Sequence, residues 1–218
     1  MSDRSPLYDP HFRGPRVSGR GRAASGAGRV RPAVFLDRDG TINEDVGYLD
    51  SLERLTLFPY SIDAVRLLNG AGFCVVVVTN QRGVATGLIS ETFLHMVHDV
   101  LSERFRRGGA RIERFYHCPH DPHAPIEQYR RDCMCRKPKP GLVLQAADDL
   151  GIDLTRSYVV GDKWSDVALA RNVGATGVLV QTGYGTTQAK RLDRPRDAIV
   201  TADLMAATVR ILELGTSE

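Results

Sequence analysis

The sequence has no long hydrophobic run, which argues against a membrane-spanning protein. Its longest tight apolar stretch covers residues 75–78, whereas a membrane-spanning helix needs about 20 apolar residues. The N-terminal region also lacks the apolar segment of a secretory signal, so we expect a cytoplasmic protein with no membrane partner. With 218 residues, the chain is long enough for one domain with a well-buried core.

Cysteine is scarce, and most of it is clustered. The four cysteines are Cys74, Cys118, Cys133 and Cys135. Cys74 lies in an apolar run and is interpreted as a small core residue. Cys118-Pro-His120 and Cys133-Met-Cys135 together supply three sulfurs and one imidazole, the closed tetrahedral set that structural Zn²⁺ prefers. In a reducing compartment such a cluster favours a metal over a disulfide, so we predict a zinc-binding loop at residues 117–136. Unrelated loop residues are the alternative.

The net charge of +3 is unevenly distributed. Residues 1–31 contain seven Arg and two Asp, a balance of +5, which leaves −2 for the rest. Residues 1–30 are rich in Gly, Arg, Ser and Ala and poor in large apolar groups, which predicts a flexible tail. An Arg-rich tail is also compatible with a transit peptide or a nucleic-acid arm. Because the remaining body is not basic, we expect no nucleic-acid partner and interpret residues 31–218 as one domain.

Strand-like and helix-like segments alternate along this body. The pattern predicts strands at residues 33–36, 73–78, 112–116, 157–160, 177–180 and 198–200. It predicts helices at 61–69, from Ser90 to about 106, at 141–150, at 165–173, and a last helix capped by Thr201. Residues 45–58 and 181–195 are expected to be irregular. Such alternation predicts an α/β fold with a doubly wound, mainly parallel sheet.

Polar groups follow several of the predicted strands, beginning with Asp37 and Asp39. Their side chains point the same way on an extended chain because side chains alternate with period 2. Carboxylates at a strand end suit a hard cation such as Mg²⁺, although a polar loop alone would explain them. Equivalent positions hold Thr79 and Asn80, then Asp162 and Asp166, while Arg136 and Lys137 precede a helix. Ligands of such folds bind beyond the carboxyl ends of the strands, so these groups predict a phosphoryl pocket.

Four motifs resemble those of the haloacid dehalogenase (HAD) superfamily of phosphatases. They are D-R-D-G-T at 37–41, T-N-Q at 79–81, R-K-P at 136–138 and G-D-K-x-x-D at 161–166. The resemblance implies a Rossmann-like core in which Asp37 is the nucleophile and forms an aspartyl-phosphate. It also implies that Asp39 is the general acid and base, and that Thr79 and Lys137 bind the transferred phosphoryl oxygens. The implied Mg²⁺ ligands are Asp37, the backbone carbonyl of Asp39, and Asp162.

The predicted zinc loop makes the resemblance more specific, because two groups of HAD phosphatases share its pattern. C-P-H followed by C-x-C-R-K-P is similar to the D-glycero-D-manno-heptose 1,7-bisphosphate 7-phosphatases and to the histidinol-phosphate phosphatases. D-V-G-Y at 45–48, G-V-A-x-G at 83–87 and Q-T-G-Y-G at 181–185 are more similar to the heptose enzymes. This resemblance implies that there is no large cap domain. The residues interpreted as substrate-binding are Asp45, Val46, Gly47, Tyr48, Asn80, Gln81, Arg82, Arg136 and Lys163.

One position departs from the family pattern. Many heptose phosphatases read T-N-Q-S-G-I-A-R-G, whereas this chain has Arg82 in place of the serine and Thr86 in place of the arginine. We hypothesise that Arg82 supplies the charge missing from position 86 and helps Arg136 to hold the second phosphate of a bisphosphate. The alternative is that Arg82 points into solvent.

The sequence therefore predicts a Mg²⁺-dependent enzyme that hydrolyses a sugar phosphate, with the heptose 7-phosphate as the leading substrate and a monomer as the expected state. The nearest alternative is a histidinol-phosphate phosphatase. A polynucleotide 3′-phosphatase shares D-x-D-G-T, but the zinc tetrad and the acidic body argue against it. A non-enzymatic, zinc-stabilised binding module would leave Asp37, Asp39, Lys137 and Asp162 without a role.

Overall fold

A six-stranded parallel sheet forms the centre of the molecule, in the order β3-β2-β1-β4-β5-β6. The computed structural model describes residues 30–191, 195 and 198–215; residues 1–29 of the predicted flexible tail lie outside the described residues. The strands are β1 (Ala33–Leu36), β2 (Cys74–Asn80), β3 (Arg114–Cys118), β4 (Tyr158–Gly161), β5 (Thr176–Val180) and β6 (Ile199–Thr201). All neighbouring strands pair in parallel. The predicted doubly wound parallel sheet is confirmed.

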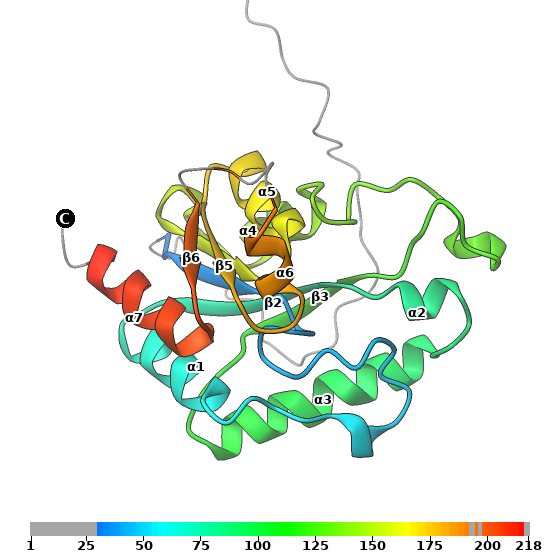
Figure 1. Cartoon of the computed structure of the whole chain (residues 1–218), viewed down its shortest axis with the longest axis horizontal. Helices are drawn as coiled ribbons and strands as arrows, with labels where there is room; N and C mark the ends of the chain where they lie inside the picture. Colours follow the sequence, from blue (N-terminus) through cyan, green and yellow to red (C-terminus); the bar gives the residue numbers. More distant parts are fainter. Residues whose placement is uncertain (1–29, 192–194, 196–197, 216–218) are drawn as a thin grey trace, which may run out of the picture.

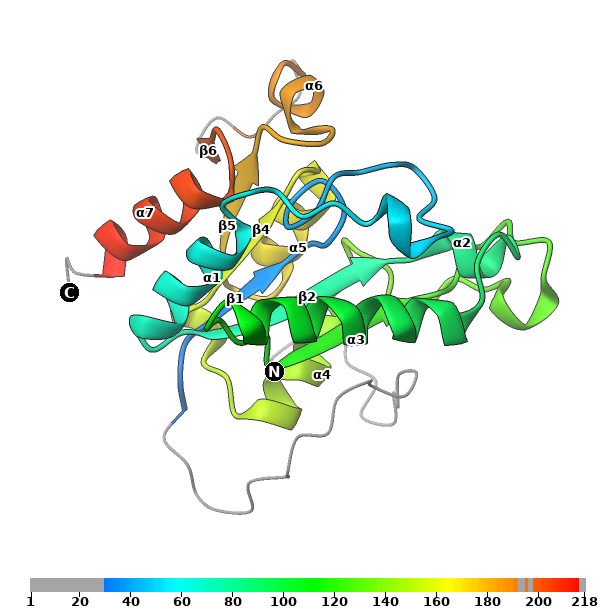
Figure 2. The ribbon, with the colours of Figure 1, turned by 90° about the horizontal axis from the view of Figure 1, so that it is seen from below.

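Helices cover both faces of this sheet (Figures 1 and 2). On one face lie α1 (Ser61–Gly70), α3 (Glu91–Arg107) and α7 (Leu204–Gly215), whose buried residues share one core cluster. On the other face lie α4 (Gly141–Leu150) and α5 (Trp164–Asn172), which share the second large cluster. Two short helices, α2 (Arg82–Ala85) and α6 (Gly185–Ala189), follow strands β2 and β5. Single turns of 3₁₀ helix occur at Leu52–Arg54, Glu127–Tyr129 and Leu154–Arg156.

The valine run of β2 explains why both faces need a cover. Val75 and Val77 belong to the core cluster under α1, α3 and α7, whereas Val76 and Val78 belong to the one under α4 and α5. Successive side chains of a strand point to opposite faces, so a continuous apolar run requires burial on both sides. Phe35 of β1 pairs in register with Val76 on one side and Val159 on the other, which makes β1 a central strand.

Three expectations about the elements differ from the structure. The third strand lies two residues later than expected, so that Cys118 is its last residue. The last helix begins at Leu204, and the Asp203 carboxylate, not Thr201, accepts a hydrogen bond from the Ala206 N–H at 2.8 Å. The stretch at 181–195, expected to be irregular, contains α6. Ser90 does cap α3, because its Oγ accepts from the Phe93 N–H at 3.0 Å.

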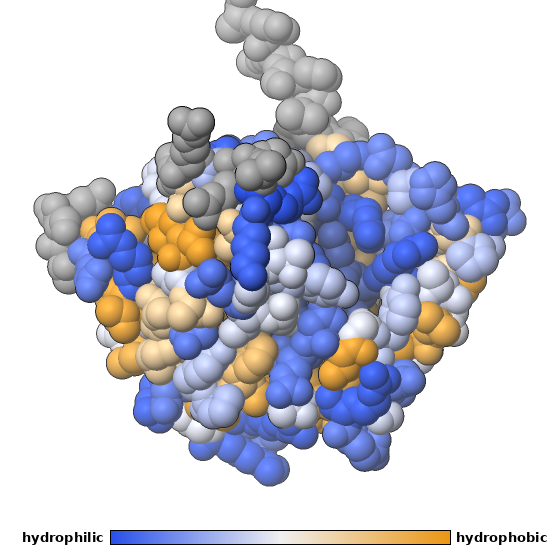
Figure 3. Space-filling model, in the orientation of Figure 1, coloured by the Kyte–Doolittle hydropathy of each residue, from blue (hydrophilic) through white to orange (hydrophobic). Residues whose placement is uncertain are grey.

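The order of the strands determines where a ligand site can form. Strand β1 lies between β2 and β4, so the chain leaves it in one direction and returns on its other side, which is the topological switch point of such a sheet. The carboxyl ends of β1, β2 and β4 therefore meet there. Among the described residues, no helix is long and apolar enough to cross a membrane. On the face drawn in Figure 3, hydrophilic residues predominate and hydrophobic ones form small separate patches.

Candidate active site

Three carboxylates converge just beyond the ends of β1 and β4. Asp37, Asp162 and Asp166 each offer an oxygen, and these oxygens lie within 4.8 Å of one another. Lys137, which comes from the segment before α4, lies between them. Its Nζ is 2.9 Å from Asp37 Oδ1 and 2.7 Å from Asp166 Oδ1, and it donates to the carbonyl of Val78 at 2.9 Å. All four side chains are buried, and Lys137 is shared by two of the three carboxylates, Asp37 and Asp166.

The electrostatics of this cluster favour an additional cation. Burial and the nearby charge of Asp37 raise the pKa of Asp162 to about 7. Burial also raises the pKa of Asp166. Burial alone would lower the pKa of Lys137, but Asp166 and Asp37 outweigh it and raise that pKa. Lys137 and Lys163 thus bring two positive charges to three buried carboxylates, which leaves an excess of negative charge.

Asp162 also has a free coordination position. Its Oδ2 accepts from the Tyr184 N–H at 2.8 Å, whereas its Oδ1 is buried without a hydrogen-bond partner in the described part of the chain. The nearest charge to Oδ1 is Lys163 Nζ at 3.6 Å. Carboxylate oxygens gathered around an unsatisfied position are the donors that Mg²⁺ prefers. Asp37, Asp162 and Asp166 could therefore hold such an ion.

Two glycines let the backbone approach Asp162 closely. Gly40 has φ of +79° and Gly183 has φ of +53°, a region that residues with a side chain rarely adopt. A Cβ atom at either position would overlap the Asp162 carboxylate. Thr182 Oγ1 donates to the carbonyl of Gly40 at 2.6 Å and joins the two loops. The loop after β5 therefore supports the metal-binding side of the site.

The last two residues of β2 and the residue that follows them hold other parts of the site in place. The Asn80 amide donates to the Lys137 carbonyl at 3.2 Å and accepts from the Lys137 N–H at 3.0 Å, so it holds the backbone that carries the lysine. The Gln81 amide donates to Thr79 Oγ1 at 2.9 Å and to Asp39 Oδ2 at 3.0 Å. Three consecutive residues thus connect β2 with Lys137 and with Asp39.

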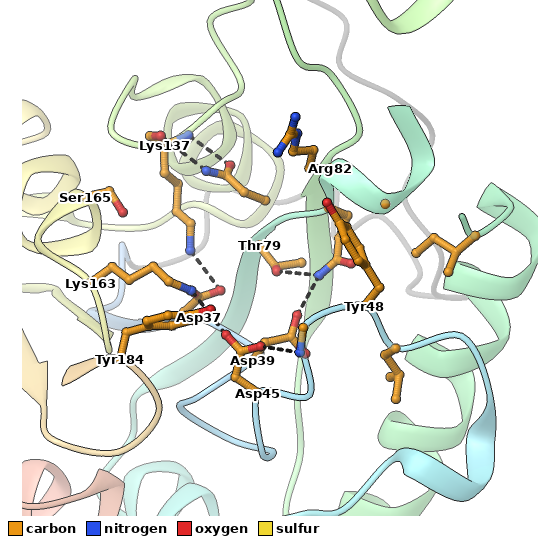
Figure 4. A pocket seen from close by; sticks show the side chains of 16 residues that line it. Asp37, Asp39, Asp45, Tyr48, Thr79, Arg82, Lys137, Lys163, Ser165 and Tyr184 are labelled. Atoms are coloured by element: carbon orange, nitrogen blue, oxygen red, sulfur yellow. Dashed lines mark hydrogen bonds and ion pairs between the residues drawn. The ribbon is translucent and has the colours of Figure 1, made fainter. Parts of the chain in front are cut away.

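A cavity of about 440 Å³ opens above these groups, with Tyr48 and Tyr184 on opposite sides (Figure 4). Among the residues predicted to bind phosphate or metal, Asp37, Asp39, Thr79 and Lys137 line it. Among the predicted substrate-binding residues, those that line it are Asp45, Gly47, Tyr48, Asn80, Gln81, Arg82 and Lys163. The remaining lining residues, which were not singled out from the sequence, are Leu49, Gly83, Ile89, Ser165 and Tyr184.

Two predicted substrate-binding residues lie outside the lining of this cavity. Val46 is partly buried and packs against the core cluster that contains α1, α3 and α7. Arg136 donates from Nη1 to the carbonyl of His120 at 3.0 Å. Lys163, by contrast, lies in the cavity with its Nζ 3.4 Å from Asp45 Oδ2 and 4.6 Å from the centre of the Tyr184 ring.

The second cluster consists of Cys118, His120, Cys133 and Cys135. All four are buried, and their ligand atoms lie within 4.8 Å of one another. The three sulfurs are 3.1 to 3.4 Å apart, and His120 Nδ1 lies 3.1 Å from Cys135 Sγ. None of the cysteines forms a disulfide. In a tetrahedral zinc site with Zn–S bonds of about 2.3 Å, the sulfurs are about 3.8 Å apart. The sulfurs here lie somewhat closer together than that. The type of the four donors and their convergence on one point fit zinc.

Asp121 connects this cluster with the cavity. It directly follows His120, and its Oδ2 lies 2.8 Å from Arg82 Nε and 3.9 Å from Arg136 Nη2. The side chain of Arg82 is 51% exposed, whereas that of Asp121 is 9% exposed. Arg82 is therefore held at the rim of the cavity and does not point freely into solvent. The zinc loop thus borders the cavity on the side of the Arg82 side chain.

Sequence comparison decides the family. The chain is 45% identical to the D-glycero-beta-D-manno-heptose-1,7-bisphosphate 7-phosphatase of Escherichia coli K12 over 158 residues, which cover 72% of this chain and 82% of the relative. The chain belongs to the HAD superfamily of phosphatases. The corresponding enzyme of Rhodopseudomonas palustris is 43% identical over 67% of this chain and 82% of its own length. Residues 134–207 match the HAD-hydrolase-like family. The chain is a phosphoric monoester hydrolase, because these relatives and the matching solved structures are phosphatases.

Solved structures of HAD phosphatases agree with this assignment. The D,D-heptose 1,7-bisphosphate phosphatase of B. bronchiseptica, solved with magnesium and phosphate, has a TM-score of 0.76 and 32% identity. The match covers 84% of this chain and 99% of that one. The D,D-heptose 1,7-bisphosphate phosphatase of Burkholderia thailandensis has a TM-score of 0.63 and 28% identity, with the same coverage. The resemblance to HAD phosphatases inferred from the motifs is confirmed.

Asp166, which the sequence placed among the groups of the predicted phosphoryl pocket, lies beside Lys137. One charged residue near the site was not assigned a role from the sequence. Arg38 lies between the two aspartates of D-R-D-G-T, and its side chain is 1% exposed. A surface arginine would be expected next to a polar loop, and no local pattern indicates that this one is buried.

Proposed function

We propose that this HAD phosphatase hydrolyses the 7-phosphate of D-glycero-D-manno-heptose 1,7-bisphosphate in a Mg²⁺-dependent reaction. The observation that carries the proposal is the 45% identity to the E. coli enzyme named for that substrate, over most of both chains. The cavity supports it, because acidic, basic and aromatic side chains together line a space large enough for a phosphorylated sugar.

The proposed reaction has two chemical steps. In the first, an Asp37 oxygen attacks phosphorus, the bond to the sugar oxygen breaks, and Asp39 donates its proton to that oxygen. In the second, Asp39 takes a proton from water as the water attacks the aspartyl-phosphate, which releases phosphate and restores Asp37. The 2.9 Å contact between Lys137 Nζ and Asp37 supports a role for Lys137 in binding phosphoryl oxygens. Thr79 would bind them from the end of β2.

The proposed ligands of Mg²⁺ are the side chains of Asp37 and Asp162 with the backbone carbonyl of Asp39. Bound Mg²⁺ neutralises phosphate charge that would otherwise repel a carboxylate nucleophile. Oδ1 of Asp162 supports this assignment, because it has no hydrogen-bond partner in the described part of the chain. Zn²⁺ is proposed to bind Cys118, His120, Cys133 and Cys135 and to hold the shape of the loop, because four protein ligands leave no open position for catalysis.

The proposed substrate contacts surround the cavity. Asp45, Gly47, Tyr48 and Lys163 would contact the sugar from the side of the 45–48 segment and α5. Arg82 and Arg136 would hold the non-reacting phosphate, as suggested by their common neighbour Asp121. A guanidinium can bind a phosphate through two parallel hydrogen bonds.

A panel of substrates tests the proposal. Phosphate release is measured for both anomers of heptose 1,7-bisphosphate, for histidinol phosphate and for a 3′-phosphorylated oligonucleotide, with the Asp37→Asn variant as a blank. We expect kcat/KM for one heptose anomer to exceed the values for the other two substrate classes by at least about 100-fold. A preference for histidinol phosphate or for the oligonucleotide would replace the proposed substrate. Phosphate release by Asp37→Asn at the wild-type rate would refute the mechanism.

A further inference from the structure

Arg38 is the largest fully buried side chain of the described residues, although it carries a positive charge. Its guanidinium faces Asp39, with Nε 3.0 Å from Oδ1 and Nη2 2.7 Å from Oδ2. This is the two-pronged geometry in which a guanidinium and a carboxylate fit best. Burying a guanidinium is unfavourable unless it is paired, so the contact with Asp39 is what allows Arg38 to be buried.

Asp39 has two further hydrogen-bond donors. Asn43 Nδ2 donates to Oδ1 at 3.0 Å, and Gln81 Nε2 donates to Oδ2 at 3.0 Å. Each carboxylate oxygen thus accepts two hydrogen bonds, and of the three donor residues Arg38 alone is charged. These four hydrogen bonds fix the orientation of the Asp39 carboxylate.

The charge of Arg38 also acts on two buried histidines, His98 and His117. His98 is 1% exposed, and its ring stacks on Phe115 with the ring centres 4.8 Å apart. Burial and the charge of Arg38 hold the pKa of His98 well below its usual range, and burial lowers that of His117 to about 4. Both rings are therefore neutral at physiological pH. Among the described residues, Asp39 is the single carboxylate within 4.0 Å of the Arg38 guanidinium, so no other acid competes for it.

We propose that Arg38 is a positioning residue for proton transfer. It holds the Asp39 carboxyl in the orientation from which that group protonates the leaving oxygen and later accepts the proton of the attacking water. Arg38 itself touches neither the phosphate nor the sugar. The inference rests on the proposed acid–base role of Asp39, but it does not depend on which sugar phosphate is the substrate.

The leaving group of the substrate distinguishes this role from a purely structural one. kcat/KM covers the steps up to cleavage of the bond to the leaving group and excludes the hydrolysis of the aspartyl-phosphate. An alkyl phosphate needs protonation of its leaving oxygen, whereas p-nitrophenyl phosphate releases an anion that is stable near neutral pH. A residue that acts through Asp39 should therefore affect the first substrate far more than the second.

The test measures kcat/KM for both substrates in wild type, Arg38→Met, Arg38→Lys and Asp39→Asn. We expect Arg38→Met to lower the value for the alkyl phosphate by about 10- to 100-fold, a part of the 10²–10⁴-fold typical of acid–base catalysis. For p-nitrophenyl phosphate the change should stay within about threefold, since its leaving group needs no proton. Arg38→Lys keeps the positive charge but loses the two-pronged contact. Its kcat/KM for the alkyl phosphate should therefore lie between the values for wild type and for Arg38→Met.

Two controls make the outcome decisive. Arg104 of α3 donates to the carbonyl of Leu55 at 2.9 Å and does not contact Asp39. Arg104→Met should therefore leave the ratio of kcat/KM for the two substrates unchanged. In an Asp39→Asn background, Arg38→Met should cause no further loss, because the group that it positions is gone. Equal losses for both substrates, or a full additional loss in the double variant, would overturn the proposal. If Arg38→Met does not fold, the test uses Arg38→Lys. The loss in kcat/KM for the alkyl phosphate is then compared with the loss for p-nitrophenyl phosphate in the same way.

The proposed function can fail separately. If heptose bisphosphate is not hydrolysed, the same ratio is measured with whichever alkyl phosphate the wild type accepts. A selective loss on that ester would support the role of Arg38 while refuting the heptose substrate.

Discussion

The molecule has two clusters of side chains whose donor atoms could hold a metal ion, and they are held in place in different ways. Asp37, Asp162 and Asp166 follow strands β1 and β4 of a sheet whose core is buried on both faces. Cys118 ends β3, but His120, Cys133 and Cys135 lie in a loop with a single turn of 3₁₀ helix. The sheet positions the carboxylates whether or not a metal is present, whereas we expect the loop to depend on a bound metal for its shape.

The two clusters also differ in charge and in the kind of ion that fits them. Three carboxylates with two lysines, Lys137 and Lys163, leave an excess of negative charge, and Oδ1 of Asp162 has no hydrogen-bond partner among the described residues. Sulfur and imidazole donors, in contrast, form a closed set of four. The comparison indicates an exchangeable hard ion at the strand ends and a permanent structural ion in the loop. The following predictions test this contrast, from the largest expected effect to the smallest.

Asp37→Asn should abolish turnover without changing the fold. It removes the proposed nucleophile and one proposed Mg²⁺ ligand while keeping the size of the side chain. We expect kcat to fall by at least about 10⁴-fold, as is typical when a nucleophile is removed. Zinc content and the circular dichroism spectrum should match those of wild type. A rate near that of wild type would contradict the assignment, and a loss of zinc would show that the two clusters are not independent.

Cys133→Ser should have the opposite effect, with a loss of zinc and of stability. We expect zinc content to fall from about one ion per chain to near zero, and the free energy of unfolding to fall by at least about 3 kcal/mol. The matched control is Cys74→Ala, because Cys74 is buried but lies outside the cluster. Elemental analysis and denaturant unfolding give both quantities. Full zinc content in Cys133→Ser would refute the tetrad.

Mg²⁺ should stabilise the protein more at pH 7.5 than at pH 5. The pKa of Asp162 is about 7 in the folded protein, against an ordinary value of 3.8. Between these values the folded state holds a proton that the unfolded chain has lost, so stability without metal falls as pH rises through this window. Bound Mg²⁺ takes the place of that proton. At 100 times its Kd, the ion should add about 2.7 kcal/mol.

Thermal unfolding with and without Mg²⁺ at the two pH values measures this effect. Asp162→Asn is the control, and it should abolish the difference because it removes the titrating group. Equal stabilisation at both pH values would show that Asp162 is not the group that binds the ion.

Mild chelation should remove Mg²⁺ and activity together while zinc stays bound, and Mg²⁺ alone should restore the activity.

Arg82→Ala should separate bisphosphate from monophosphate substrates. Arg82 is paired with Asp121, the neighbour of a zinc ligand, so it lies where the two clusters meet. A charged hydrogen bond at a half-exposed site supports a loss of about tenfold in kcat/KM for the bisphosphate and little change for a monophosphate. Arg107→Ala, on the exposed side of α3, controls for the loss of one positive charge. Equal effects on both substrates would remove Arg82 from the binding site.

Deletion of residues 1–29 should affect neither cluster. This segment is too poor in apolar groups to contribute to the core, so kcat and KM on the small substrate should stay within about twofold of wild type. Zinc content should also be unchanged. A collapse of folding or rate in the truncated protein would show that the segment docks on the body.

Most of the fold follows from local patterns, and its exceptions have a common cause. Helix α4 occupies the predicted residues, Gly141–Leu150, because its apolar residues recur with helical spacing and a glycine follows it. Helices α2 and α6 were not predicted, since four or five residues are too few to show a period. The site residues at strand ends were predicted because parallel strands bring their carboxyl ends to one edge.

The sequence by itself determined the kinds of group available and their places along the chain: the aspartates and Lys137 of the motifs, and the paired Cys and His of the loop. Their chemistry and spacing indicate a phosphatase and a zinc site, because spacing on an extended strand or in a short loop is a local property. The tertiary structure decided which atoms meet. Arg38 turns inward to Asp39, Arg82 pairs with Asp121, and Val46 packs in the core instead of the cavity. These contacts depend on how segments far apart in sequence pack, and no local pattern specifies that.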